Sequence, residues 1–207
     1  MFEAVVTHLV RRNLRGVWVR AHPRPGPAVW AANHHSWWDP FALTAVSRAL
    51  GSRSAVLMLQ ENLETFRFAR AIGAFGTGEP RQGLRFLEQG RHLIIFPEGE
   101  LRPAGPLANI APGAAWFACA AKVPLYAVAT RIQLRGHQVP EAHLVFDRVD
   151  TAGSRAEVTG RLAAQLAESL SELDDGLRQA DPRSPIRGFT LAINGRRSYE
   201  ERITWHG

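Results

Sequence analysis

The sequence AVWAANHHSWWDP occupies residues 28–40 and combines an apolar run, a polar loop and a helix start. The apolar run 28–32 predicts a buried strand. Asp39 and Pro40 are residue types preferred at a helix N-cap and at the first helical position, so they predict a helix over 41–50 that Gly51 ends. A strand, a short loop and a helix in succession form the repeating unit of α/β folds.

The same alternation continues along most of the chain. We expect strands over 17–20, 28–32, 54–59, 92–96, 123–130 and 143–149, and helices over 41–50, 63–72, 80–89, 111–121 and 157–177. Strands that alternate with helices indicate a parallel arrangement. We therefore predict a single α/β domain over residues 1–180, with a largely parallel central sheet flanked by helices. Residues 181–207, rich in Pro, Arg and Gly, are predicted to form a partly ordered tail.

The first 15 residues predict an amphipathic N-terminal helix. Apolar residues recur at helical spacing, and Arg11, Arg12 and Arg15 follow at its far end. Such a helix either lies in a membrane interface or packs on its own domain, and the sequence leaves both open. The longest uncharged stretch, 103–121, is broken by glycine and proline, so we expect no transmembrane segment.

Composition and charge narrow the classes of function. Hydrophobic residues make up 45% and charged residues 21% of the 207, as in ordinary globular proteins. The net charge of +6 comes almost wholly from arginine, since Lys122 is the one lysine, and it suits phosphates or anionic lipids. A basic helix, a zinc finger or interleaved aromatics would indicate nucleic-acid binding, and none is visible, so we expect none. The single cysteine, Cys119, fits a reducing compartment.

The loop after the strand 28–32 contains a potential base and its orienting group. If Asp39 accepts a hydrogen bond from one ring nitrogen of His34, the other nitrogen keeps a lone pair that can remove a proton from a hydroxyl. His35 is the rival base. The structural alternative is that Asp39 only caps the following helix and the histidines only pack in the loop. Both readings can hold at once.

A second polar loop follows the strand 92–96. Its sequence, PEGELR over residues 97–102, places Glu98 directly after the strand, as His34 directly follows the strand 28–32. In open α/β sheets ligands bind outside the carboxyl ends of the strands, so the two residues line one edge if their strands are parallel neighbours. Gly99 suits a tight turn or the close approach of a ligand.

These residues resemble the glycerolipid acyltransferases, a family that includes the 1-acylglycerol-3-phosphate acyltransferases. The family motif Asn-His-x4-Asp is matched by Asn33, His34 and Asp39, with Ser36 at its usual place. Phe-Pro-Glu-Gly is matched by residues 96–99, and a later Val-Pro motif by residues 123–124. The resemblance makes residues 1–180 an acyltransferase domain, with His34 as general base oriented by Asp39.

The resemblance also implies the substrates. Acyl-CoA or acyl-acyl carrier protein would supply the acyl group as a thioester, and a lysophosphatidate-type glycerolipid would accept it, with no cofactor and no metal. We assign substrate binding to Ser36, Arg81, Glu98, Gly99, Glu100 and Arg102. We expect a cytoplasmic protein that contacts the inner face of the cell membrane peripherally.

Two positions depart from the family pattern. The family has Gly-x-Phe-x-x-x-Arg in one motif, whereas residues 73–79 place Glu79 where the arginine stands; Phe-Pro-Glu-Gly is usually continued by Thr-Arg, whereas here Glu100 and Leu101 follow. Either Arg81 and Arg102, which come later in the chain, reach the acceptor's phosphate, or the acceptor is phosphate-free or glycosylated and Glu100 binds a hydroxyl.

Three other classes of function compete with acyl transfer. A metal hydrolase would bind its ion through His34, His35 and Asp39, but no second cluster with ligand spacing is present. A serine hydrolase lacks its Gly-x-Ser-x-Gly elbow. A non-catalytic lipid-binding protein would have the same pocket. An assay of acyl transfer distinguishes such a protein from an enzyme.

Overall fold

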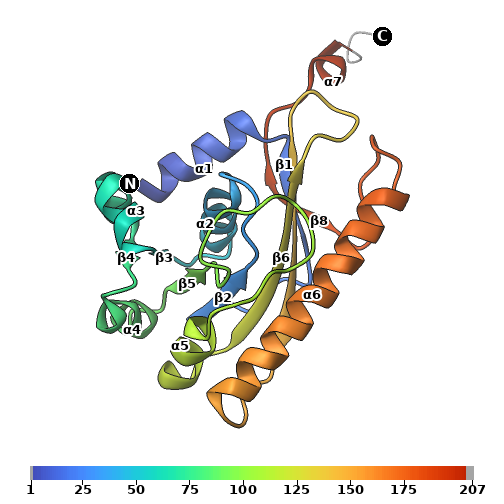
Figure 1. Ribbon diagram of the computed structural model, residues 1–207. Coiled ribbons are helices and arrows are strands. Elements are labelled where there is room, and N and C mark those ends of the chain that lie inside the picture. Colours follow the sequence, from blue (N-terminus) through green and yellow to red (C-terminus); the bar gives the residue numbers. More distant parts are fainter. Residues whose placement is uncertain (1, 204–207) are drawn as a thin grey trace.

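Eight strands form one sheet in the computed structural model, which describes residues 2–203 (Figure 1). Their order across the sheet is β4-β3-β5-β2-β6-β7-β1-β8. The strands are β1 Gly16–Arg20, β2 Ala28–Ala32, β3 Ser54–Met58, β4 Ala74–Gly76, β5 His92–Ile95, β6 Leu125–Gln133, β7 Glu141–Val149 and β8 Thr190–Asn194. β4, β3, β5, β2 and β6 run parallel, β7 is antiparallel to β6, β1 is parallel to β7, and β8 is antiparallel to β1. The predicted α/β fold with a largely parallel sheet is confirmed.

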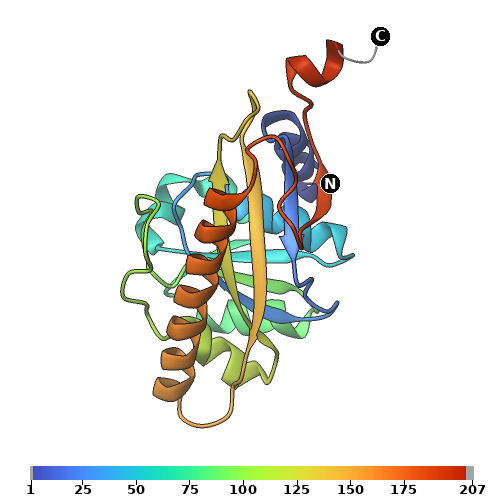
Figure 2. The ribbon, with the colours of Figure 1, turned by 90° about the vertical axis from the view of Figure 1, so that its right-hand side faces the viewer.

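Helices cover both faces of the sheet. One face is covered by α1 (Phe2–Asn13) and α2 (Asp39–Ala49), whose apolar residues join those of the sheet in one core cluster. The other face is covered by α4 (Pro80–Glu88), α5 (Gly113–Ala121) and α6 (Arg155–Gln179), which lies along the sheet in Figure 2. Ser154 and Glu157 form a capping box that starts α6. Burial of apolar side chains on both faces explains why the central strands β2, β3 and β5 are largely apolar.

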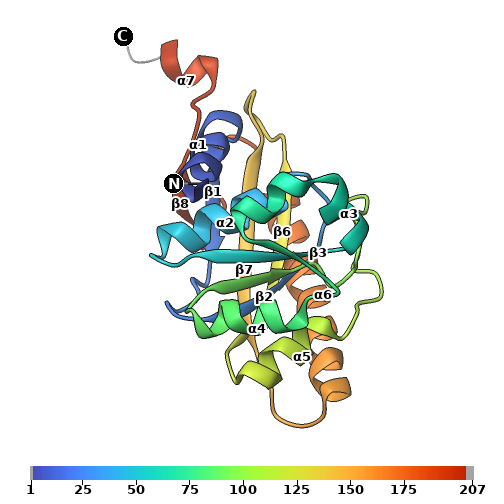
Figure 3. The ribbon, with the colours of Figure 1, turned by 90° about the vertical axis from the view of Figure 1, so that its left-hand side faces the viewer.

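The region between β3 and β4 differs from its prediction. In place of one helix over 63–72, α3 (Gln60–Thr65) ends at Phe66, and a 3-10 helix, η1 (Arg67–Ile72), follows. Figure 3 shows these elements on the side of the molecule where β3 and β4 lie. The three residues of β4 then extend the sheet beyond β3. A strand of three residues has too short an apolar pattern to be recognised.

The C-terminal segment contributes an edge strand that the sequence pattern did not reveal. β8 pairs with β1, although most of its side chains are not buried. Tyr199–Ile203 then forms the short helix α7. Arg15 binds Glu201 of α7 at 2.6 Å and Glu141 of β7 at 2.8 Å, so the segment is fixed to the sheet. Of the predicted tail over 181–207, residues 204–207 lie outside the described residues, as does Met1 of the predicted N-terminal helix.

The N-terminal helix packs on the domain and also exposes apolar side chains. Val6 and Val10 of α1 are buried, whereas Val5 and Leu9 are exposed. Within residues 2–203, no helix has the length and apolar character needed to cross a bilayer.

The topology brings the two polar loops together. β2 and β5 are parallel neighbours, with Ala28 opposite His92 and Ala31 opposite Ile95. Their carboxyl ends therefore meet at the same edge, and the loops that begin at Asn33 and Phe96 leave the sheet side by side.

Candidate active site

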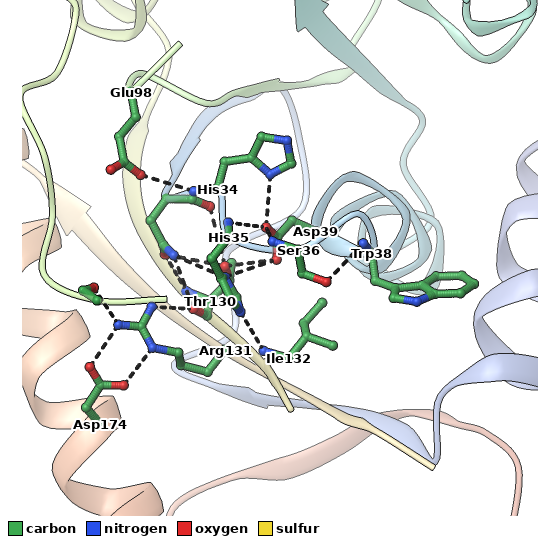
Figure 4. A network of polar contacts seen from close by, with 12 residues as sticks. His34, His35, Ser36, Trp38, Asp39, Glu98, Thr130, Arg131, Ile132 and Asp174 are labelled. Carbon is green, nitrogen blue, oxygen red and sulfur yellow. Dashed lines mark hydrogen bonds and ion pairs between the residues drawn. The ribbon is translucent and has the colours of Figure 1, made fainter. Parts of the chain in front are cut away.

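His34 and Asp39 form the pair that the sequence predicts. Nδ1 of His34 lies 3.0 Å from Oδ2 of Asp39, and Figure 4 shows the other ring nitrogen pointing away from the polar network. The Asp39 side chain is fully buried, and that of His34 is 20% exposed. A bond from Nδ1–H to the carboxylate leaves Nε2 as the nitrogen with the free lone pair.

Asp39 is held by donors on both of its oxygens. Oδ2 also accepts hydrogen bonds from the backbone N–H groups of His35, at 2.9 Å, and Ser36, at 2.8 Å. Oδ1 accepts one from Oγ1 of Thr130 at 3.2 Å. The prediction that Asp39 caps α2 is wrong, because the N-cap is Trp38 and no side chain caps the helix. The carboxylate instead accepts bonds from the loop that precedes the helix, and these donors fix its orientation.

His35 is occupied by the backbone and does not compete with His34 as a base. Its Nε2 accepts a hydrogen bond from the backbone N–H of Ile132 at 3.0 Å. Burial is the main cause that lowers the pKa of His35, so the ring is neutral at physiological pH. It connects the loop to β6.

Glu98 joins the second loop to the first. Its Oε1 accepts the backbone N–H of His34 and its Oε2 that of Ala108, both at 3.1 Å. The backbone N–H of Arg102 donates to the carbonyl of His34 at 2.8 Å. Gly99 has a φ of +80°, a conformation that favours glycine, and it turns the chain between these contacts. Glu98 thus has both oxygens bound to backbone, which makes it a positioning group for His34.

The other predicted substrate-binding residues lie in different environments. Oγ of Ser36 accepts the backbone N–H of Trp38, so its hydroxyl shapes the loop. Glu100 and Arg102 form an ion pair with each other. Arg81 is exposed on the first turn of α4 and is absent from the wall of the cavity described below. Gly99 and Glu100 do line that cavity.

His34 opens onto a cavity of about 710 Å³. Its ring stacks on Phe96, with 4.2 Å between the ring centroids. Most of the other lining side chains are apolar, among them Trp37, Phe41, Val56, Leu57, Met58, Phe66, Ile95, Trp116 and Phe117. A second, polar pocket also touches His34 but has a volume of about 10 Å³, the size of one water molecule. The large cavity therefore gives His34 mainly apolar surroundings on its open side.

A comparison with models of protein families identifies the family of this chain. A model described as Acyltransferase matches residues 19–131, which include both polar loops. The chain belongs to the acyltransferase family. The resemblance drawn from the three motifs is thereby confirmed.

The fold of this acyltransferase has a solved counterpart. It is similar to the crystal structure of the 1-acyl-sn-glycerophosphate (LPA) acyltransferase PlsC from Thermotoga maritima, with a TM-score of 0.57 and 20% identity over 84% of this chain and 77% of that one. At this identity the likeness concerns the fold. A comparison with curated protein sequences gives no match.

Several contacts that build the site of this acyltransferase could not be predicted from the sequence. Asn33, 4% exposed, accepts the backbone N–H of Thr130 through its side-chain oxygen at 2.8 Å and donates to the Thr130 carbonyl at 3.3 Å. Its amide thus continues the pairing of β2 with β6 beyond the end of the strand. Arg131 binds Asp174 of α6 and the carbonyl of Gly105. Asn33 stands in the recognised motif, but nothing in the sequence links it to Thr130.

Glu79, which stands at the arginine position of the family's Gly-x-Phe-x-x-x-Arg motif, forms an ion pair in this acyltransferase. Glu79 binds both terminal nitrogens of Arg70, at 3.0 and 3.1 Å, and accepts the backbone N–H of Gly76. The bond from Arg70 is the main cause that lowers the pKa of Glu79, so the carboxylate is charged. A phosphate placed there would meet a negative side chain whose nearby cation is already paired.

Proposed function

We propose that the protein transfers a fatty acyl group from a thioester to a hydroxyl of a lysophosphatidate-type glycerolipid. One observation carries the proposal: the His34–Asp39 pair, 3.0 Å apart, stands in the wall of a large cavity lined by apolar side chains. A base beside an apolar cavity suits a reaction between two lipid substrates.

The reaction needs one base and no covalent intermediate. With Nδ1–H bound to Asp39, Nε2 of His34 takes the proton of the acceptor hydroxyl while that oxygen forms a bond to the thioester carbonyl carbon. The carbon–sulfur bond then breaks, and the imidazolium returns the proton to the leaving thiolate. Asp39 favours the charged imidazolium during these steps. The products are the ester and the free thiol.

The donor we propose is acyl-CoA or acyl-acyl carrier protein, bound as a substrate. No cofactor or metal enters the reaction, because the thioester already supplies an activated carbonyl. The donors around Asp39 support the same view, since its Oδ2 is engaged by a ring nitrogen and two backbone N–H groups.

The acceptor has a second candidate, a phosphate-free or glycosylated lipid. The ion pair of Glu79 with Arg70 favours it, because the family's phosphate-binding position carries a carboxylate here. Glu100, which lines the cavity, offers an acceptor for a hydroxyl hydrogen bond. The rates of acyl transfer to the two classes of acceptor are therefore compared directly.

The purified protein, given radiolabelled palmitoyl-CoA or palmitoyl-acyl carrier protein, is expected to label lysophosphatidate. Lysophosphatidate, monoacylglycerol and a lysoglycolipid are offered in parallel, and products are separated by thin-layer chromatography. Faster labelling of a phosphate-free lipid would replace the first acceptor by the second. If neither donor labels any acceptor, transfer is rejected and a non-catalytic lipid-binding role stands in its place.

We also propose that the cavity opens toward a membrane surface. Trp37, Leu59, Phe68 and Leu101 are 42–57% exposed and line the cavity. The rings of Trp37, Phe66 and Phe68 follow one another at 6.0 and 6.1 Å between centroids. An exposed apolar rim of this kind suits contact with lipid, and the positive net charge suits anionic headgroups.

A double substitution of Trp37 and Phe68 by serine is expected to weaken binding to vesicles of phosphatidylglycerol and phosphatidylcholine by about tenfold or more, since two large apolar side chains no longer enter the bilayer. Vesicle sedimentation measures the bound fraction. The control is Tyr199→Ser, because Tyr199 is 59% exposed and lies on α7, away from the cavity wall. Equal loss in both proteins would contradict the proposed membrane face.

A further inference from the structure

The cavity extends along both faces of the sheet. On the side of α1 and α2 its wall includes Phe41, Val56 and Met58, which belong to the core cluster of that face. On the side of α5 its wall includes Leu57, Ile95 and Phe117, which belong to the opposite cluster. Both sides belong to the same large cavity, which His34 also lines, so a substrate can occupy one side while its reacting atom stays near the base.

The two sides differ in charge. Among residues 2–203, the charged side chains that line the cavity, His34 apart, are those of Glu100 and Arg155. Glu100 is paired with Arg102. Arg155 stands in the first turn of α6, whose N-terminal end lies beside α5 (Figures 1 and 2), and is exposed. No hydrogen bond or ion pair engages its guanidinium within the described part of the chain. The α5 side therefore presents an unpaired cation, and the α2 side presents apolar walls.

We propose that Arg155 binds a phosphate group of a substrate on the α5 side while an acyl chain occupies the apolar α2 side. The inference rests on the proposed function, because both lysophosphatidate and acyl-CoA join an apolar chain to a phosphate. The ligand chemistry is the same for the two sources. The experiment below decides whether Arg155 binds the phosphate of the acyl donor or that of the acceptor.

Within residues 2–203, Arg155 is the arginine that lines the cavity, and three arginines outside its wall are already paired. Arg70 is paired with Glu79, Arg102 is paired with Glu100, and Arg131 is held by Asp174 and the carbonyl of Gly105. A guanidinium offers several donors to phosphate oxygens and keeps its charge at every physiological pH. A dianionic group that enters an apolar cavity needs such a partner, since burying it unpaired is costly.

Equilibrium dialysis at ligand concentrations below micelle formation tests the assignment. Wild type, Arg155→Ala and Arg155→Lys are compared with Arg85→Ala, a control on α4 whose exposed side chain is absent from the cavity wall. Four probes are used in two matched pairs: palmitoyl-CoA with palmitoyl-N-acetylcysteamine, and lysophosphatidate with monoacylglycerol. The second member of each pair lacks phosphate.

Arg155→Ala is expected to weaken binding of one phosphate-bearing probe by about tenfold, with partial recovery in Arg155→Lys, because one charge-assisted contact is lost. The phosphate-free partner and the Arg85→Ala control keep wild-type affinity. Loss with palmitoyl-CoA assigns Arg155 to the donor, and loss with lysophosphatidate assigns it to the acceptor. Unchanged affinity for both, or equal loss for the phosphate-free probes, overturns the proposal. Absence of turnover in the wild type rejects acyl transfer, while the dialysis still decides the role of Arg155.

Discussion

Replacing His34 by alanine is expected to lower kcat for acyl transfer by about 10²–10⁴-fold, the usual contribution of a positioned general base. The acceptor hydroxyl is then left with no base, since the side chain of the neighbouring His35 is only 6% exposed and its Nε2 accepts the backbone N–H of Ile132. Binding of the acyl thioester persists, because the cavity walls are unchanged apart from one ring. Steady-state rates with saturating donor and acceptor measure the loss.

The control for this experiment is a histidine outside the site. His22 is exposed and bonds Oγ1 of Thr190. It stands before the amino end of β2, whereas both polar loops leave the carboxyl ends of their strands. His22→Ala is expected to retain the wild-type kcat. A His34→Ala protein that binds the thioester and turns over at the wild-type rate would show that the base has been assigned to the wrong residue.

Asp39→Asn is expected to cause the second largest loss, again about 10²–10⁴-fold in kcat, with lower stability. An amide has one acceptor oxygen, whereas both oxygens of Asp39 accept bonds. In one orientation the amide NH2 faces Oγ1 of Thr130, and in the other it faces the donors that bind Oδ2 of Asp39. In both orientations Nδ1–H of His34 loses its charged partner. Each buried donor that remains unpaired costs about 1–3 kcal/mol of folding free energy. Steady-state kinetics and thermal unfolding measure the two effects separately.

Asp175→Asn provides the matched control, because Asp175 is 54% exposed on α6 and pairs only with the exposed Arg178 among the described contacts. It should keep both kcat and the midpoint of thermal unfolding. If Asp39→Asn behaves like this control, the carboxylate does not orient the base.

The fold was largely predictable because its signals are local. The apolar run of β2, the Pro40 helix start and the Gly51 stop each indicate their element within a few residues. The nearness of Glu98 to His34 followed from one general rule about the carboxyl ends of parallel strands, and the pairing of β2 with β5 fulfils that rule. The break at Phe66 and the edge strand β8 were missed, because both depend on packing rather than on pattern.

The hydrogen bonds of the site could not be predicted from the sequence. Asp39-Pro40 matches a helix cap in sequence, and the structure instead turns the carboxylate back onto the backbone of His35 and Ser36. From the sequence, Glu98 is predicted to bind substrate. In the structure its two side-chain oxygens accept hydrogen bonds from the backbone N–H groups of His34 and Ala108. These contacts depend on the folded shape of the two loops and leave no periodic signal, so residue type alone could not predict them.

A comparison of single and double variants tests most directly whether Asp39 acts through His34. Rates of acyl transfer are measured for His34→Ala, Asp39→Asn and the double variant, at a temperature below the unfolding transition of all three. Because the carboxylate acts through the imidazole, the double variant is expected to be no slower than His34→Ala alone. Losses that multiply would mean that Asp39 acts independently of His34, and they would contradict the proposed mechanism.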